Sequence, residues 1–262
     1  MTTQPFSRVL LTNDDGIDAP GLAILEDVAR QLAREVWVAA PAHDQSGTSH
    51  SISLHDPLRI SRFGERRFAV DGTPGDCVAI GIRHLMADTP PDIILSGINR
   101  GANLGTETVF SGTVGAAMTG MLLGVPSIAL SQAFTDRANV RWETARKLAP
   151  DVIRQLADFA WSHGACLNIN FPDCAPEEVG SFMFTRQGHG LLDGIGVVTR
   201  ADPRGLDYHW LELNRSEKPD HPETETAALA SGHISVTPLR FERTHDGVWK
   251  SLSKQIEMLD GR

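Results

Sequence analysis

Two adjacent carboxylates follow the first apolar run of the chain. Residues 8–13 read RVLLTN, and Asp14 and Asp15 come directly after them. Two neighbouring carboxylates repel each other, so holding both at the end of one strand costs free energy unless a cation compensates for their charge. A single Asp in such a place is more often a helix cap or a turn residue. The pair therefore indicates a cation site.

Further oxygen donors follow other apolar runs in the same way. The run at 35–42 leads into a loop that contains Ser46, and the run PDIILSGIN ends at Asn99. In an open parallel sheet, ligands bind where the carboxyl ends of the strands meet. Carboxylate, hydroxyl and amide oxygens, without thiols or imidazoles among them, suit a hard divalent cation such as Mg²⁺ or Mn²⁺. We therefore expect one such cation at this edge of the sheet.

A segment of small polar residues at the start of a predicted helix offers a site for an anion. Ser111, Gly112 and Thr113 precede the run VGAAMTGMLLG. Hydroxyls, free backbone N–H groups and the helix dipole at such a start all favour a bound phosphate. A cation beside a phosphate site is typical of phosphoester hydrolysis, because the cation polarises a phosphoryl oxygen and lowers the pKa of a bound water.

Other nucleotide-binding and hydrolase motifs are absent from the sequence. There is no GxxxxGK[ST], no G-x-G-x-x-G after the first strand and no G-x-S-x-G. Their absence argues against a P-loop NTPase, a dinucleotide-binding enzyme and a serine hydrolase.

The elements that must position these residues alternate between strand and helix. The run at 8–13, the amphipathic stretch at 21–35 and the run at 35–42 predict a strand–helix–strand unit, and the alternation continues to residue 172. This pattern predicts an α/β fold, Rossmann-like and doubly wound, with a mostly parallel sheet.

The part of the chain after residue 172 has a different texture. Residues 181–213 form strand-like runs separated by Gly and Pro, without a helix between them, which predicts a C-terminal β-hairpin extension. A short helix (TETAALASG), a last strand (HISVTPL) and a closing helix (VWKSLSKQIEML) follow. We expect a Rossmann-like catalytic core over 1–172. We expect a hairpin and tail over 173–262 that pack back on the core and mediate oligomerisation.

Composition narrows the class of partners. The chain has 262 residues, and its formal net charge of −9 disfavours binding to a nucleic-acid polymer, which needs a basic surface. No apolar run approaches the roughly 18 residues of a membrane span. The three cysteines show neither zinc-finger nor disulfide-framework spacing. We expect a cytoplasmic protein that does not enter the membrane.

Five blocks of the sequence, in this order, resemble the SurE (survival protein E) family. They read NDDGIDAPG, APAHDQSGTSHSISL, DGTPGDCV, PDIILSGINRGANLG and FSGTVGAAMTG, and the similarity continues to SGHISVTPL. The resemblance implies a Rossmann-like fold whose C-terminal hairpin and tail are exchanged between subunits of a homodimer or homotetramer. It also implies metal-dependent removal of phosphate from nucleoside 5′- and 3′-monophosphates, and action on short polyphosphate in some members.

The resemblance also assigns roles to residues of this chain. It implies one divalent cation, Mg²⁺ or Mn²⁺, held by Asp14, Asp15, Ser46 and Asn99. A metal-activated water would attack phosphorus, with Asp14 or Asp15 as the catalytic carboxylate that positions or deprotonates it; direct attack by a carboxylate stays open. The phosphate pocket it implies consists of Asn103, Ser111, Gly112 and Thr113, with Asn13 nearby.

Two positions depart from the family pattern. Gln45 stands where a basic residue is usual, and Glu225 stands where Asp is usual. Neither is one of the four implied metal ligands.

Other functions remain open at this point. A non-catalytic nucleotide or phosphate sensor would use the same residues. A phosphatase with an aspartyl-phosphate intermediate needs D-x-D, whereas here the two acids are adjacent. A structural assembly module would account for the hairpin but for none of the oxygen donors.

Overall fold

A computed structural model describes residues 4–157, 164–216 and 221–260. Within this part of the chain, a nine-stranded sheet has the order β3-β4-β2-β1-β5-β6-β7-β11-β8. Neighbouring strands from β4 to β7 are parallel, whereas β3 pairs antiparallel with β4 and β11 pairs antiparallel with β7. The strands are β1 (Phe6–Thr12), β2 (Ala33–Pro41), β3 (Ile60–Arg62), β4 (Arg67–Val70), β5 (Ile93–Arg100), β6 (Ser127–Gln132), β7 (Cys166–Phe171), β8 (Phe182–Phe184) and β11 (Ile234–Leu239).

The chain starts in the middle of this sheet and fills it in two directions. From β1 it moves outward to β2 and β4, returns to β5 on the other side of β1, and continues to β6 and β7. The strand order therefore reverses between β1 and β5, which is where open α/β sheets bind ligands. The predicted doubly wound, mostly parallel fold is confirmed.

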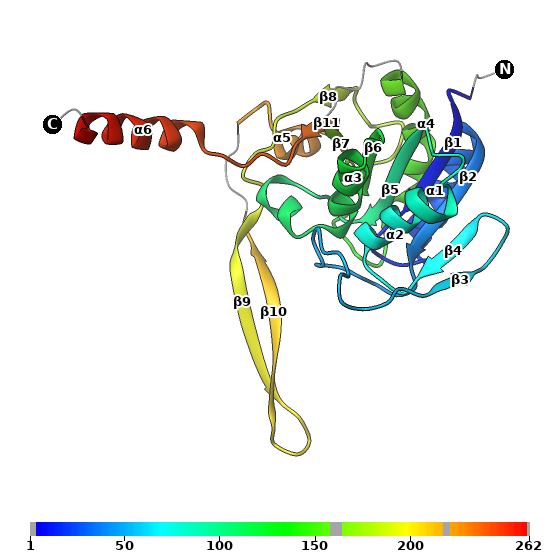
Figure 1. The fold of residues 1–262 in the computed structure, drawn as a ribbon, viewed down its shortest axis with the longest axis horizontal. Helices are drawn as coiled ribbons and strands as arrows, with labels where there is room; N and C mark the ends of the chain where they lie inside the picture. Colours follow the sequence, from blue (N-terminus) through cyan, green and yellow to red (C-terminus); the bar gives the residue numbers. More distant parts are fainter. Residues whose placement is uncertain (1–3, 158–163, 217–220, 261–262) are drawn as a thin grey trace.

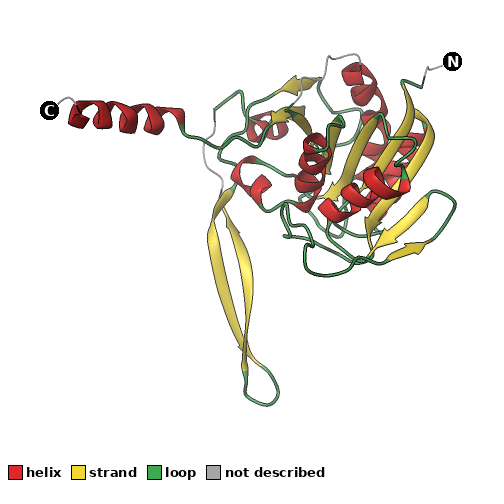
Figure 2. Cartoon of the chain, in the orientation of Figure 1, coloured by secondary structure: helices red, strands yellow, loops and turns green. Residues whose placement is uncertain are grey.

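Helices cover both faces of the sheet (Figure 2). The helices α1 (Pro20–Arg30) and α4 (Trp142–Ala157) pack on one face, and α2 (Pro74–Ile80) and α3 (Gly112–Leu122) pack on the other. Two short turns adjoin these helices. The π-helical turn η1 (Gly81–Leu85) follows α2, and the 3₁₀ turn η2 (Gly105–Val109) precedes α3.

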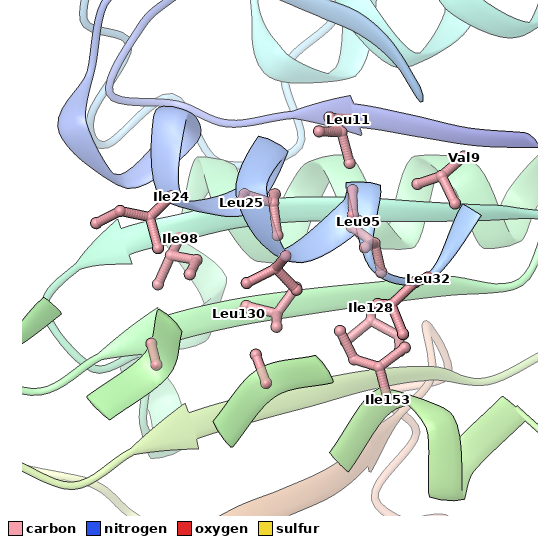
Figure 3. Close-up of a cluster of buried hydrophobic side chains, with 14 of the residues drawn as sticks. Val9, Leu11, Ile24, Leu25, Leu32, Leu95, Ile98, Ile128, Leu130 and Ile153 are labelled. Carbon is pink, nitrogen blue, oxygen red and sulfur yellow. The ribbon is translucent and has the colours of Figure 1, made fainter. Parts of the chain in front are cut away.

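Alternation along β1 connects the sheet to both layers. Val9 and Leu11 belong to the cluster with α1 and α4, whereas Leu10 belongs to the cluster with α2, because successive side chains of a strand point to opposite faces. Figure 3 shows Leu25 of α1 and Ile153 of α4 over the first of these faces. Apolar side chains therefore pack against both faces of β1. This packing fixes the position of the residues that follow the strand.

Two segments extend away from the sheet (Figure 1). The antiparallel hairpin of β9 (Leu192–Ala201) and β10 (Asp207–Arg215) forms a sheet of its own, which confirms the predicted hairpin. The helix α6 (Asp246–Asp260) leaves the body after β11, and the short α5 (Glu225–Ala230) precedes β11.

The domain boundary at residue 172 stays a prediction of the sequence. In the structure, β8 and β11 come after that residue and belong to the main sheet, while the hairpin and α6 extend from it. No helix in the described part of the chain has both the length and the apolar character needed to span a lipid bilayer.

Candidate functional site

The site forms at the carboxyl end of β1, where the strand order reverses. Asp14 is 5% exposed, and its burial raises the pKa of the carboxyl to about 6. Burial also raises the pKa of Asp15, against the opposing charge of Arg100. Asp14 has no ion-pair partner among the residues that the structure describes. Two adjacent carboxylates, one buried and one partly buried, are in this state strong candidates for cation ligands.

The start of α3 packs directly against Asp14. The Thr113 hydroxyl donates a hydrogen bond of 2.5 Å to Asp14 Oδ1. A Cβ at Gly112 would lie only 2.7 Å from Asp14 Cβ, so this close contact requires glycine. Ser111 caps the helix by accepting the Val114 N–H at 3.0 Å, a bond that does not use its own hydroxyl hydrogen. The predicted cation ligand and the predicted phosphate site are therefore in contact.

Asp15 lies against the end of β5, the strand that carries Asn99. The backbone N–H of Arg100 lies 3.4 Å from Asp15 Oδ2. Between Ser96 and Asn99 the pairing of β5 with β6 shifts, with a positive φ of 137° at Gly97. A side chain at Gly97 would lie 2.3 Å from a carbonyl of β6. Such an irregularity redirects the residues that follow. The amide of Asn99 donates to the Gly101 carbonyl at 2.8 Å, which leaves the amide oxygen for a ligand.

Ser46 reaches the site through its own loop. Asp44 Oδ1 accepts hydrogen bonds from the backbone N–H and the hydroxyl of Ser46, at 2.8 and 2.6 Å. The backbone N–H of Gln45, the residue between Asp44 and Ser46, donates to the Asp14 carbonyl at 2.8 Å. Asp44 thus orients Ser46 and leaves the lone pairs of the hydroxyl oxygen for a cation. Asp44 lies in the loop that follows the run at 35–42, but the local sequence pattern assigned no role to this residue.

Asn13 holds the turn that carries the two carboxylates. Its Nδ2 donates to the Gly16 carbonyl at 2.8 Å. Its Oδ1 is buried and has no hydrogen-bond partner among the described residues. A buried acceptor without a donor is costly, so this oxygen is a place where a bound group would supply the missing contact.

The side chain of Asn103 points to β6 and not to the start of α3. Its Nδ2 donates to the Ser131 hydroxyl at 2.9 Å, and its backbone N–H donates to Asn170 Oδ1 at 2.8 Å. Asn168 and Asn170, both on β7, donate to its carbonyl. Asn103 therefore anchors the loop before η2, and a role in binding phosphate stays a prediction. The two buried asparagines of β7 were not predicted, although polar residues inside the run CLNINF were a visible signal.

Glu225 ties the same loop to the C-terminal part of the chain. It is 1% exposed, and its carboxylate accepts the Gly105 N–H at 2.5 Å and the Gly188 N–H at 2.9 Å. In the middle of η2, the guanidinium of Arg215 donates to both oxygens of Glu107, at 2.7 to 3.3 Å. The base of the hairpin thus holds η2, the turn that leads into the start of α3.

The donor set fits a hard divalent cation. Asp14, Asp15, Ser46 and Asn99 offer two carboxylates, one hydroxyl and one amide oxygen, and the carboxylates are desolvated. Oxygen ligands of these types are those that Mg²⁺ and Mn²⁺ prefer. With the N–H groups of α3 beside Asp14, the arrangement can bind a phosphate next to a cation.

Comparisons with known proteins identify a family that this chain resembles over most of its length. A family model described as survival protein SurE matches residues 9–193. The 5′-nucleotidase SurE 1 of Burkholderia lata is 66% identical over 245 residues, covering 93% of this chain and 95% of that protein. The 5′-nucleotidase SurE of Nitrobacter hamburgensis is 47% identical and covers 95% of this chain and 100% of that protein.

A solved structure shares the fold over almost the whole chain. The crystal structure of the SurE protein from Aquifex aeolicus superimposes with a TM-score of 0.81 at 35% sequence identity, covering 95% of this chain and 99% of that chain. The family model alone spans well over half of the chain, and the two relatives cover 93% and 95% of it. The chain belongs to the SurE family.

Proposed function

We propose that the protein is a metal-dependent nucleotidase, a phosphomonoesterase that removes phosphate from nucleoside 5′- and 3′-monophosphates. Short polyphosphate is a further candidate substrate. The observation that carries this proposal is the direct contact between Asp14 and the start of α3 at Gly112 and Thr113, because it joins a cation ligand to a phosphate site. The names of the relatives support the nucleotidase activity. A cytoplasmic location is part of the same proposal.

Each residue of the site has a distinct task in this mechanism. Asp14, Asp15, Ser46 and Asn99 would hold the cation, which supplies polarisation of the phosphoryl oxygen and a lower pKa for a bound water. The substrate phosphate binds to the N–H and hydroxyl groups that begin α3, which offer hydrogen bonds and the positive end of the helix dipole. One of the two carboxylates orients the attacking water and accepts its proton.

The first test measures phosphate release from a panel of nucleoside 5′- and 3′-monophosphates with Mg²⁺ or Mn²⁺, and again with EDTA. Release that EDTA abolishes supports the proposal. Asp14→Asn should abolish turnover without unfolding the protein. Asp18→Asn is a matched control, because Asp18 lies in the same loop but is exposed, and this variant should keep wild-type activity. Near wild-type turnover in Asp14→Asn would contradict the metal-site assignment.

A second test separates attack by water from attack by a carboxylate. In a single turnover in H₂¹⁸O, water attack places the label in the first phosphate released. Attack by Asp14 or Asp15 would place the label in the enzyme first. If the wild-type protein binds nucleotides but releases no phosphate with any metal, the sensor function replaces the enzymatic one.

We also propose that the protein forms a homodimer or homotetramer through its two projecting segments. The hairpin exposes Trp210 and Leu211, and α6 exposes Trp249 and Leu252, each between 56% and 75%. Large apolar side chains that gather on a surface commonly mark a protein–protein contact.

A further inference from the structure

A cavity of about 490 Å³ adjoins the cation site on the side of Asp15. The start of α1, the end of β5 and the segment 137–142 form its walls, and Asp15, Asp44, Arg100, Arg137 and Trp142 are among its lining residues. This volume lies in the range of about 300–1,000 Å³ that is usual for small-molecule sites. The cavity reaches Asp15 but does not include Asp14 or the start of α3, so it offers room for the leaving group of a bound phosphomonoester on the Asp15 side of the cation site.

The walls of this cavity are fixed by contacts of their own. Asp136 accepts the Ala138 N–H at 2.9 Å and the Asn139 side-chain amide at 2.6 Å, which shapes the turn that carries Arg137. On the opposite wall, a Cβ at Gly21 would lie 1.9 Å from the Ile98 carbonyl and 3.2 Å from the Trp142 ring. Helix α1 is thus in close contact with both β5 and Trp142.

Two arginine side chains offer hydrogen-bond donors to a ligand in this cavity. Arginine has five N–H donors and no acceptor. Within the described part of the chain, the guanidinium groups of Arg100 and Arg137 have neither a hydrogen bond nor an ion pair, although both charges act on Asp15. Asp44 already accepts two hydrogen bonds from Ser46, and Asp15 is a predicted cation ligand. A ligand that enters here meets two donor groups without partners.

We propose that this cavity holds the nucleoside half of the substrate, and that Arg100 and Arg137 select bases with a carbonyl at C6 of a purine or at C4 of a pyrimidine. This proposal rests on the nucleotidase function proposed above. Hypoxanthine, guanine and uracil present acceptor oxygens to the guanidinium groups, whereas adenine and cytosine present an amine, a donor that faces other donors. Arg paired with O6 and N7 of a purine is the bidentate contact by which proteins read guanine in DNA.

Inosine and adenosine 5′-monophosphates form the sharpest substrate pair, because they differ at the purine edge by the 6-oxo and 6-amino groups. We expect the wild-type protein to show a kcat/KM about tenfold higher for the inosine nucleotide, the size of one good Arg–base contact. Arg100→Gln and Arg137→Gln should each bring this ratio towards one. Both charges also act on Asp15, but that effect changes both substrates equally and cancels in the ratio.

Two further variants test the contact between arginine and base. One separates the geometry of the contact from its charge, and the other controls for a nonspecific effect of replacing an arginine in this segment. Arg137→Lys keeps the positive charge near Asp15 but loses the planar fork, so the ratio should fall here as well. Arg141→Gln is the matched control: it lies in the same segment, but its Nε pairs with Asp173 at 3.3 Å, and the cavity does not include it. Its ratio should equal that of the wild type.

The possible outcomes are distinct. A wild-type ratio near one, or a ratio that survives both Arg→Gln variants, would overturn the proposal. If these variants instead raise KM for a nucleoside 3′,5′-bisphosphate or for tripolyphosphate and leave the ratio unchanged, the cavity receives a second phosphate and base selection is wrong.

Equilibrium binding separates this proposal from the nucleotidase proposal. If no monoester releases phosphate, the nucleotidase function fails. A calorimetric Kd that is lower for the inosine than for the adenosine nucleotide, with a difference that Arg137→Gln removes, would still support the cavity assignment. Equal values of Kd would overturn it.

Discussion

At the scale of single residues, the absence of a side chain at one position matters as much as the acids do. Gly112 lets the start of α3 approach Asp14 closely enough for Thr113 to donate to its carboxylate. Sequence alone identified the pair of acids and the helix start, because both are local patterns. It did not show that they touch, since 99 residues separate Asp14 from Thr113. It likewise assigned no role to Asp44, whose hydrogen bonds to Ser46 depend on the turn between them.

Gly112→Ala tests that contact. The added Cβ would lie 2.7 Å from Asp14 Cβ, so the carboxylate or the helix start must move. A displacement of this kind at a reacting centre can lower kcat/KM about 100-fold while the fold persists. Kinetics with a nucleoside monophosphate and circular dichroism would measure the two effects. Gly194→Ala adds a methyl group in open space and should match the wild type; full activity in Gly112→Ala would count against the contact.

His50 predicts a dependence of stability on pH. Burial, and then the charge of Arg243, lower its pKa below the ordinary value of 6.5. Below pH 6.5 the unfolded chain therefore binds a proton more readily than the folded protein, so stability is complete above that pH and falls as the pH falls towards the lower pKa of the folded state. Arg240 and Glu242 line the same cavity as His50 and Arg243.

Thermal unfolding of wild type and His50→Gln between pH 7.5 and 5.5 would measure this effect. We expect the wild-type midpoint to fall more steeply below pH 6.5 than that of the variant. Because His50 is only half-buried, the difference should be small. Parallel curves for the two proteins would show that His50 makes no such contribution.

At the scale of elements, local sequence patterns predicted whether most segments form a helix or a strand. They did not predict which strands lie side by side in the sheet. The strands and helices near the N-terminus were clear, because apolar periodicity and short connections define a strand–helix–strand unit. HISVTPL was predicted as a strand, yet its place between β7 and β8 depends on pairing across more than 50 residues. The two turns η1 and η2 were not predicted, since single turns carry no periodic signal.

Glu225 connects elements that the sequence could not relate. Its carboxylate accepts the N–H of Gly105, which begins η2, and the N–H of Gly188, which precedes the hairpin. Glu225→Ala would leave one buried and one partly buried N–H group without their acceptor, and we expect it to lower the free energy of unfolding by about 1–3 kcal/mol or somewhat more. Urea denaturation would measure this loss.

The same variant should also affect catalysis, because η2 leads into Ser111. We expect Glu225→Ala to raise KM more than it lowers kcat at a temperature where the protein stays folded, since phosphate binding is what the displaced turn disturbs. Glu225→Gln retains one acceptor oxygen and should be intermediate in stability. Glu223→Ala removes only an exposed ion pair with Arg186 and should change stability by less than about 1 kcal/mol. Equal effects of Glu223→Ala and Glu225→Ala would contradict the role of Glu225.

At the scale of the whole molecule, the hairpin and α6 lie apart from the main sheet and expose apolar side chains (Figure 1). On α6, Val248, Trp249, Leu252 and Ile256 have a helical spacing that places them along one side. A helix of this kind that contacts little of its own chain is expected to bury that side against a second copy. The proposed assembly rests on these exposed apolar side chains and not on any single motif.

Leu211→Glu on the hairpin and Leu252→Glu on α6 test this assembly separately. Each places a charge on an apolar surface, so each should lower the molar mass found by light scattering after size-exclusion chromatography. Lys250→Glu introduces the same side chain at an exposed polar position of α6 and should leave the mass unchanged. If the wild-type protein is monomeric at all accessible concentrations, the proposed homodimer or homotetramer is wrong.

Cation binding must also be visible in the stability of the whole fold, independently of activity. The two desolvated carboxylates repel each other, and the unfolded chain does not hold the four ligands together, so a divalent cation should bind the folded protein alone. At a concentration of 100 times its Kd, such a ligand stabilises the fold by about 2.7 kcal/mol, which raises the unfolding midpoint by about 5–10 °C. Differential scanning calorimetry with Mn²⁺ and with EDTA should show this shift for the wild type and for Asp18→Asn. Asp14→Asn should lose most of it, and a full shift in that variant would mean that the cation binds elsewhere.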